Sequence, residues 1–111
     1  MICWVADVYT AIAEPTRRAI LDELIERDGQ TLFEICVRLT MKHGLSSTRQ
    51  AISQHLDVLE SAGLVTTRRE GRYKFHFVDP RPLQQIVERW PINDREDLSR
   101  HEDHRDQRPR R

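Results

Sequence analysis

The stretch Ser46-Ser47-Thr48-Arg49-Gln50-Ala51-Ile52-Ser53-Gln54-His55-Leu56 decides the fold of this chain. Its apolar residues, continued by one more, recur at the spacing of a single helix face: Ile52, Leu56 and Leu59. Ser46 or Ser47 is suited to cap this helix, because a serine hydroxyl can accept a hydrogen bond from the first free backbone N–H groups. We therefore predict a helix that packs by one face and leaves a polar face outward.

Three further helices are predicted upstream of this stretch. Asp7 is placed to cap a short first helix, and Pro15 begins a second, since the first helical position needs no N–H donor. Thr31 and Glu34 have the spacing of a capping box for a third helix. That helix should end near His43-Gly44.

Downstream, the hydrophobic period changes from 3.6 to 2, which indicates strands. Residues 64–68 and 73–78 are predicted to form a hairpin around Glu70-Gly71, with Tyr73, Phe75 and Phe77 alternating with more polar residues. A last helix carries Leu83, Ile86, Val87 and Trp90 on one face. The order is four helices, a β-hairpin and a fifth helix. This mainly α plan is that of a winged helix-turn-helix, in which the third helix supports the fourth and the fourth is the recognition helix.

The length of 111 residues allows one domain. We expect residues 1–90 to form one winged-helix domain. Twelve of the residues 91–111 are charged, six of each sign, so this segment is predicted to be a disordered tail. Neither a signal peptide nor a membrane span is expected, because apolar runs are short and interrupted by charges.

The formal net charge of zero hides a polarised chain. Residues 1–30 carry three Lys or Arg against six Asp or Glu, whereas residues 38–74 carry seven against three. A neutral total alone would argue against a nucleic-acid partner. The local excess of positive charge around the fourth helix and the hairpin favours one.

Polar side chains in the first two turns of a recognition helix are typical of groups that contact bases and phosphates. The candidates on the fourth helix are Ser47, Thr48, Arg49, Gln50, Ser53, Gln54 and His55. The candidates around the hairpin turn, where phosphate contact is expected, are Arg68, Arg69, Arg72 and Lys74. The alternative interpretations are an ordinary solvated helix face and a hairpin whose charges protect its edges from aggregation.

Three motifs resemble the ArsR-type (ArsR/SmtB-like) winged-helix regulators. They are Ala13-Glu14-Pro15-Thr16-Arg17-Arg18-Ala19-Ile20-Leu21, then Ser53-Gln54-His55-Leu56 with Leu59, and Ala62-Gly63-Leu64-Val65 followed by Arg69-Glu70-Gly71-Arg72. The resemblance covers roughly residues 7–90. It implies a prokaryotic dimeric regulator, most often a repressor, that binds a near-palindromic operator in double-stranded DNA.

The resemblance also implies that the first and last helices form the dimer interface. The chain offers apolar residues for it: Trp4, Val5, Val8, Ile12, Leu83, Ile86, Val87 and Trp90. About ninety structured residues favour a core shared between two protomers. The alternative is that both apolar stripes close on the core of the monomer.

Many members of this family sense metals through paired cysteines on the third helix, and the other family site uses Asp, His and Glu ligands on the last helix, where this chain has no histidine. Here Cys36 stands alone and Arg38 occupies the second position, so a small buried hydrophobe is the expected role of Cys36. His101 and His104 have ligand spacing but lie in the charged tail without apolar support. We therefore expect no metal and no cofactor.

The sequence thus predicts a cytoplasmic, sequence-specific DNA-binding regulator without enzyme activity and without metal sensing, whose effector is unknown. One alternative is a winged-helix module for protein–protein contact. Another is a small metal-dependent enzyme that uses His101 and His104.

Overall fold

In the computed structural model, which describes residues 7–92, the decisive stretch forms helix α4 (Arg49–Ser61). Its apolar stripe, Ile52, Leu56 and Leu59, is buried as predicted. The cap is Thr48, whose hydroxyl accepts a hydrogen bond from the Ala51 N–H at 3.0 Å. The expectation of a cap at Ser46 or Ser47 is therefore wrong by a residue or two. Residues 44–48 have no regular secondary structure, and the helix begins correspondingly later.

The first two helices begin as the sequence predicts. In α1 (Val8–Ile12), the Asp7 carboxylate accepts a hydrogen bond from the Thr10 N–H at 2.8 Å. Pro15 is the first residue of α2 (Pro15–Glu26). The Glu14 carboxylate caps α2 by accepting hydrogen bonds from two of its free backbone N–H groups.

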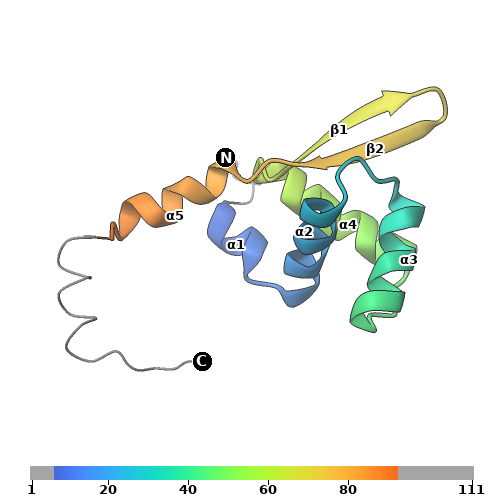
Figure 1. Cartoon of the computed structure of the whole chain (residues 1–111), viewed down its shortest axis with the longest axis horizontal. Helices are drawn as coiled ribbons and strands as arrows, with labels where there is room; N and C mark the ends of the chain where they lie inside the picture. The colour runs from blue at the N-terminus through green and yellow to red at the C-terminus, as the bar shows by residue number, and fades with distance from the viewer. Residues whose placement is uncertain (1–6, 93–111) are drawn as a thin grey trace.

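Helix α3 (Leu32–His43) has the predicted capping box between Thr31 and Glu34. It ends at Gly44, whose φ of +67° is a left-handed conformation that glycine adopts without steric cost. Helices α3 and α4 are the two helices of the predicted helix-turn-helix, and the N-terminal part of α4 follows closely after the end of α3 (Figure 1).

Strands β1 (Val65–Glu70) and β2 (Tyr73–Val78) form the predicted antiparallel hairpin, in which Val65 pairs with Val78 and Glu70 with Tyr73. Residues of β2 alternate between the two faces of the hairpin as expected, but the face that turns inward is not the one that carries Tyr73. His76, on the more polar face, is buried, whereas Tyr73 is exposed. The Gln30 backbone pairs with His76 and accepts a hydrogen bond from its ring, so the inward imidazole has a partner.

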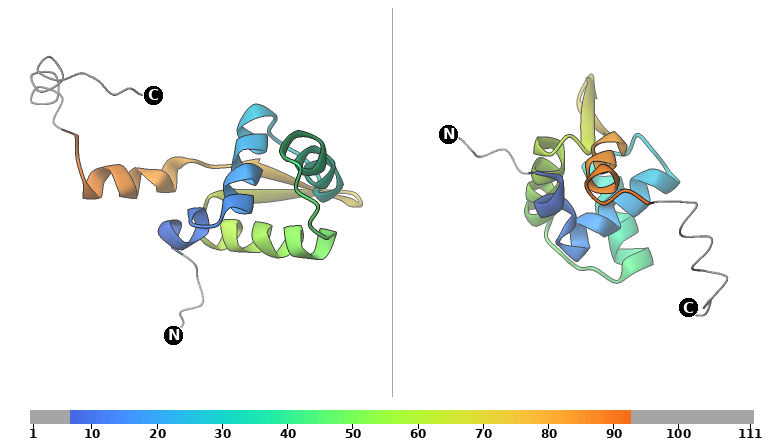
Figure 2. Two further views of the ribbon diagram at one scale, coloured as in Figure 1. Left: turned by 90° about the horizontal axis from the view of Figure 1, so that it is seen from below. Right: turned by 90° about the vertical axis from the view of Figure 1, so that its left-hand side faces the viewer.

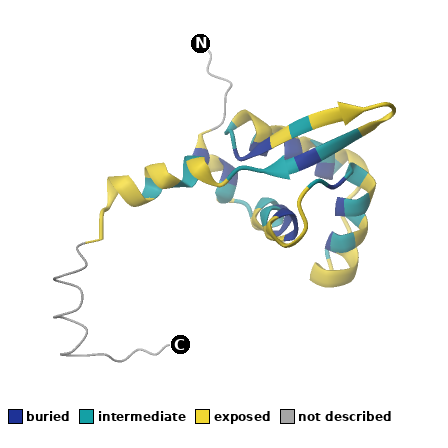
Figure 3. Cartoon of the chain, turned by 45° about the horizontal axis from the view of Figure 1, so that its top comes forward, coloured by how far each residue is buried: buried dark blue, intermediate teal, exposed yellow. Residues whose placement is uncertain are grey.

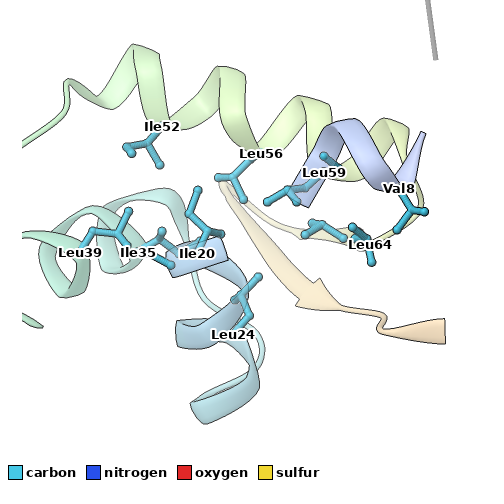
Figure 4. Packing of buried hydrophobic residues seen from close by; sticks show 12 residues of the cluster. Val8, Ile20, Leu24, Ile35, Leu39, Ile52, Leu56, Leu59 and Leu64 are labelled. Atoms are coloured by element: carbon cyan, nitrogen blue, oxygen red, sulfur yellow. The ribbon is translucent and has the colours of Figure 1, made fainter. Parts of the chain in front are cut away.

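The hydrophobic core lies between α1, α2, α3, α4 and the base of the hairpin (Figure 4). The large buried side chains that meet there are Val8, Ile20, Leu24, Ile35, Leu39, Ile52, Leu56, Leu59 and Leu64. The views of the ribbon place α3 and the tip of the hairpin at one end of the molecule and α5 (Gln84–Arg89) at the other (Figures 1 and 2).

Helix α5 follows a short 3₁₀ turn, Arg81–Leu83, and projects from the body of the molecule (Figure 3). It has no buried residue, although Leu83 and Ile86 pack in part against the core. No helix within residues 7–92 is long and apolar enough to cross a membrane. The predicted interface residues Trp4 and Val5, and nearly all of the predicted tail, lie outside the described residues.

A buried carboxylate joins α2 to α3. The side chain of Glu23 accepts a hydrogen bond from Arg38 Nε at 2.6 Å, and His43 Nε2 lies 2.8 Å from its second oxygen. Lys42 completes the cluster at 3.7 Å and also pairs with Glu26. Burial alone would raise the pKa of Glu23, but the hydrogen bonds from His43 and Arg38 outweigh it and hold this pKa below its usual value of 4.5.

Because the folded-state pKa of Glu23 is lowered, its contribution to stability should be complete above pH 4.5 and be lost as the pH falls through the lowered value. We expect Glu23→Gln to reduce the free energy of unfolding by about 1–3 kcal/mol at neutral pH, since it removes a charged partner from Arg38. The difference in free energy of unfolding between the wild type and Glu23→Gln, measured by urea unfolding, should become smaller as the pH falls below 4.5. A difference that stays constant, or an equal effect of Asp22→Asn on the exposed face of α2, would contradict this role.

Candidate nucleic-acid interface

The outward face of α4 carries polar side chains that are free to bind a partner. Arg49, Gln50 and Gln54 are exposed and Ser53 is half-buried. Within residues 7–92, none of these four side chains forms a hydrogen bond or an ion pair. All four lie in the first two turns, the part of a recognition helix that enters the major groove. Arginine and glutamine can each make paired hydrogen bonds to base edges there.

The three remaining candidates on this segment lie in different surroundings. Ser47 is exposed ahead of the helix, and the Thr48 hydroxyl already serves as its cap. His55 lies at the side of α4, where its Nδ1 is 3.1 Å from Arg17 Nη1 and its Nε2 is 4.0 Å from a Glu14 oxygen. The structure thus brings His55 to α2, while its DNA contact stays a prediction.

Sequence reasoning did not find the contact that orients His55. The Arg17 side chain also donates to the backbone carbonyl of Ala11 at 2.8 Å and to that of Thr10 at 3.2 Å. One guanidinium therefore links α1, α2 and α4. Arg17 is part of the first motif, but neither helical period nor charge pattern indicates a contact 38 residues away.

The four basic residues of the hairpin differ in their availability. Arg68 pairs with Glu70 at 3.1 Å and lies 4.9 Å from the ring centroid of Phe77. Arg69 and Arg72 are exposed and, among the described residues, have no ion-pair partner. Arg69 is paired across the strands with Lys74, so these two side chains share one face.

A groove of about 320 Å³ separates α4 from the hairpin. Arg49 and Ser53 line it from the helix, and Arg72 and Lys74 line it from the wing. The tertiary structure thus brings four of the predicted site residues to one concave surface. The two segments are more than fifteen residues apart in the sequence, so this convergence depends on how the hairpin folds back along the helix.

The candidate metal ligands are not brought together. Cys36 is half-buried on α3, and burial raises the pKa of its thiol although the charge of Arg49 opposes this. Arg38, at the position of the missing second thiol, is engaged by Glu23 and Glu26. Within residues 7–92 no three His, Cys, Asp or Glu side chains are grouped to hold a metal, and His101 and His104 lie outside that range.

Comparison with known proteins identifies the family. A family model described as a helix-turn-helix domain matches residues 12–68. The uncharacterized HTH-type transcriptional regulator YuzN of Bacillus subtilis is 48% identical over 83 residues, which are 75% of this chain and 90% of that protein. The transcriptional repressor SdpR of the same organism is 29% identical over 78% of this chain and 88% of its own length.

Solved structures agree with this assignment. The crystal structure of a possible transcriptional regulator for arsenical resistance superposes with a TM-score of 0.64 at 34% sequence identity, covering 86% of this chain and 95% of that one. All three proteins are named as transcriptional regulators or as a transcriptional repressor, the last of them as a possible one. The helix-turn-helix, the hairpin wing and these likenesses together show that the chain belongs to the DNA-binding winged helix-turn-helix transcriptional regulators of the ArsR family.

Proposed function

We propose that the protein is a homodimeric repressor that binds a near-palindromic operator in the cytoplasm and does not sense a metal. In this proposal the start of α4 reads bases in the major groove and the wing contacts the phosphate backbone. The observation that carries it is the convergence of Arg49, Arg72 and Lys74, which have no ion-pair partner within residues 7–92, at the groove between α4 and the hairpin. A repressing role is supported by the named function of the relative SdpR.

Dimerisation is supported by the state of α5. This helix has six residues, and isolated helices shorter than about 12 residues are marginal in water. Its surface includes Val87 and Trp90, which are 51% and 62% exposed. The Trp90 ring meets Tyr9 of α1 edge-on, with the ring centroids 6.4 Å apart, so the two helices present one apolar surface. A second copy of the chain would cover this surface and supply the packing that α5 lacks.

Other predicted interface residues contribute differently to this proposal. Val8 is buried in the core of its own chain, and Ile12, Leu83 and Ile86 pack partly against that core. We therefore assign the centre of the proposed interface to Val87 and Trp90. A two-fold dimer would present two α4 helices to successive turns of the major groove, which is the reason for expecting a near-palindromic operator.

The absence of metal sensing is supported by two features of α3. A raised thiol pKa disfavours the thiolate of Cys36 that a soft metal requires. Arg38 pairs with the buried Glu23. A cation therefore occupies the position where a second metal ligand would be needed. Control by a signal other than a metal fits this arrangement.

The proposed base contact of Arg49 gives the first test of DNA recognition. We expect Arg49→Ala to weaken binding to a duplex selected from the host genome by about 1–3 kcal/mol and to relax preference at one position. Gel-shift titrations against the selected duplex and its single-base variants measure both effects. Unchanged affinity and preference would contradict the placement of α4 in the major groove.

The wing should act through charge alone. Arg69→Gln and Arg72→Gln should weaken all duplexes alike and reduce the slope of log K against log salt by about 0.9 for each phosphate that is no longer neutralised. Arg68→Gln is the matched control, because Arg68 already pairs with Glu70 and should change the slope less. Salt titrations of fluorescence anisotropy report the slope, and an unaltered slope in both variants would remove the wing from the interface.

The proposed dimer interface can be separated from other exposed apolar positions. Val87→Glu should shift the protein toward monomer in analytical ultracentrifugation, because it places a charge in an apolar contact. Ile25→Glu is the control, since Ile25 is 64% exposed on α2 and lies outside the proposed interface. An unchanged association constant for Val87→Glu, or an equal decrease for Ile25→Glu, would refute the assignment of α5.

A further inference from the structure

The groove between α4 and the hairpin also contains groups that DNA binding does not use. Its volume of about 320 Å³ falls in the range of about 300–1,000 Å³ that is typical of small-molecule sites. Its apolar lining comes from Leu32, Phe33, Leu56 and Tyr73, and Phe33 and Tyr73 are largely exposed for residues of their size. The cavity lining therefore combines apolar side chains with acidic and basic ones.

One end of the cavity carries hydrogen-bond acceptors. His76 is 6% exposed, and its Nδ1 must donate to the Gln30 carbonyl oxygen at 2.9 Å, because a carbonyl can only accept. Burial lowers the pKa of His76, so the ring stays neutral and its Nε2 is an acceptor. Within residues 7–92 this Nε2 has no hydrogen-bond partner. Gln30 Oε1 is the one buried side-chain polar atom of that range without a partner, so His76 Nε2 reaches open space.

Two carboxylates share the cavity with this imidazole. Asp57 and Glu60 line the same cavity from α4, and the charges of both act on His76. Among the described residues, Asp57 has no ion-pair partner, and the Glu60 carboxylate accepts only a long hydrogen bond of 3.4 Å from the Thr67 hydroxyl. The cavity thus presents three acceptors, His76 Nε2 and the carboxylates of Asp57 and Glu60, that have no ion-pair partner among the described residues.

The remaining polar lining is cationic. Arg49, Arg72 and Lys74 line the cavity, and within the part of the chain that the structure describes none of them pairs with Asp57 or Glu60. Opposite charges that share a cavity without contact leave room for a molecule that contacts both. DNA phosphates would satisfy the cations but would be repelled by the two carboxylates and would offer no donor to His76.

We propose that this cavity binds a small zwitterion with an apolar body, of the chemical class of the apolar α-amino acids. The ammonium group donates to the acceptors His76, Asp57 and Glu60, and the carboxylate binds the cations Arg49, Arg72 and Lys74. The apolar side chain lies against Phe33 and Tyr73. Because the bound molecule occupies cations that we assign to DNA contact, it competes with the operator. This last step rests on the function proposed above.

Calorimetry on the full-length protein without DNA tests the site directly. L-phenylalanine and L-leucine are the zwitterionic probes, while phenethylamine and 3-phenylpropanoate each carry only one of the two charges. We expect saturable binding of the amino acids and affinities lower by about tenfold or more for the single-charge analogues. Lack of binding of both amino acids at millimolar concentration, or equal binding of the analogues, would overturn the proposal.

Variants locate the site and separate it from DNA binding. Asp57→Asn changes an exposed residue outside the proposed DNA contacts and removes a charge that repels phosphate, so the fold should be retained and DNA affinity should not fall, while amino-acid affinity falls by about tenfold or more. Asp22→Asn, an exposed acid on α2, should change neither. Unchanged amino-acid binding by Asp57→Asn would overturn the proposed site.

Competition is measured with the genome-selected duplex. L-phenylalanine should release this DNA from the wild-type protein and not from Asp57→Asn. DNA that stays bound while calorimetry shows saturation with L-phenylalanine would refute the competition. Failure of the protein to bind any duplex would instead contradict the proposed function, and the calorimetric result would stand apart from it.

Discussion

The burial of Ile52, Leu56 and Leu59 is the constraint on which the rest of the structure depends (Figure 4). These side chains fix the rotation of α4 about its axis, because turning the helix would expose them at a cost of about 1.5–3 kcal/mol each. With that rotation fixed, Arg49, Gln50 and Gln54 can only face outward. The ability of α4 to present a polar face therefore follows from the packing of its apolar one. The polar groups need no partner within the described chain, and this leaves them free for an external one.

The second constraint is the link between the α2–α3 loop and the wing. The Gln30 backbone exchanges hydrogen bonds with His76 at 2.8 and 3.1 Å, which holds β2 beside the loop. Gly29 makes this approach possible. Its φ is +73°, and a Cβ at this position would lie 3.0 Å from the Phe77 ring. The contact of Gln30 with β2 positions the wing relative to α4 and so helps to define the groove between them.

The two ends of the molecule expose different kinds of side chain. At the end with the wing and the start of α4, Arg49, Arg72 and Lys74 have no ion-pair partner among residues 7–92, which suits ligands that bind and leave (Figure 1). At the opposite end, Val87 and Trp90 are exposed within the described residues 7–92, which is the basis for the proposed contact with a second chain. Between these ends, Arg17 joins α1, α2 and α4 through its carbonyl and His55 contacts. The buried Glu23 joins α2 to α3, so side-chain contacts link all four of the helices α1, α2, α3 and α4.

The sequence by itself determined the elements and their order. Caps at Asp7 and Thr31, the proline that begins α2 and the change of period at the hairpin act through neighbouring residues, so local chemistry is sufficient to predict them. Only the tertiary structure decided which strand face turns inward, that His55 meets Arg17, and that Asp57, Glu60 and His76 share a cavity with the cations. These contacts join residues far apart in the chain. Their geometry depends on the packing of whole elements, and no periodicity within one segment records it.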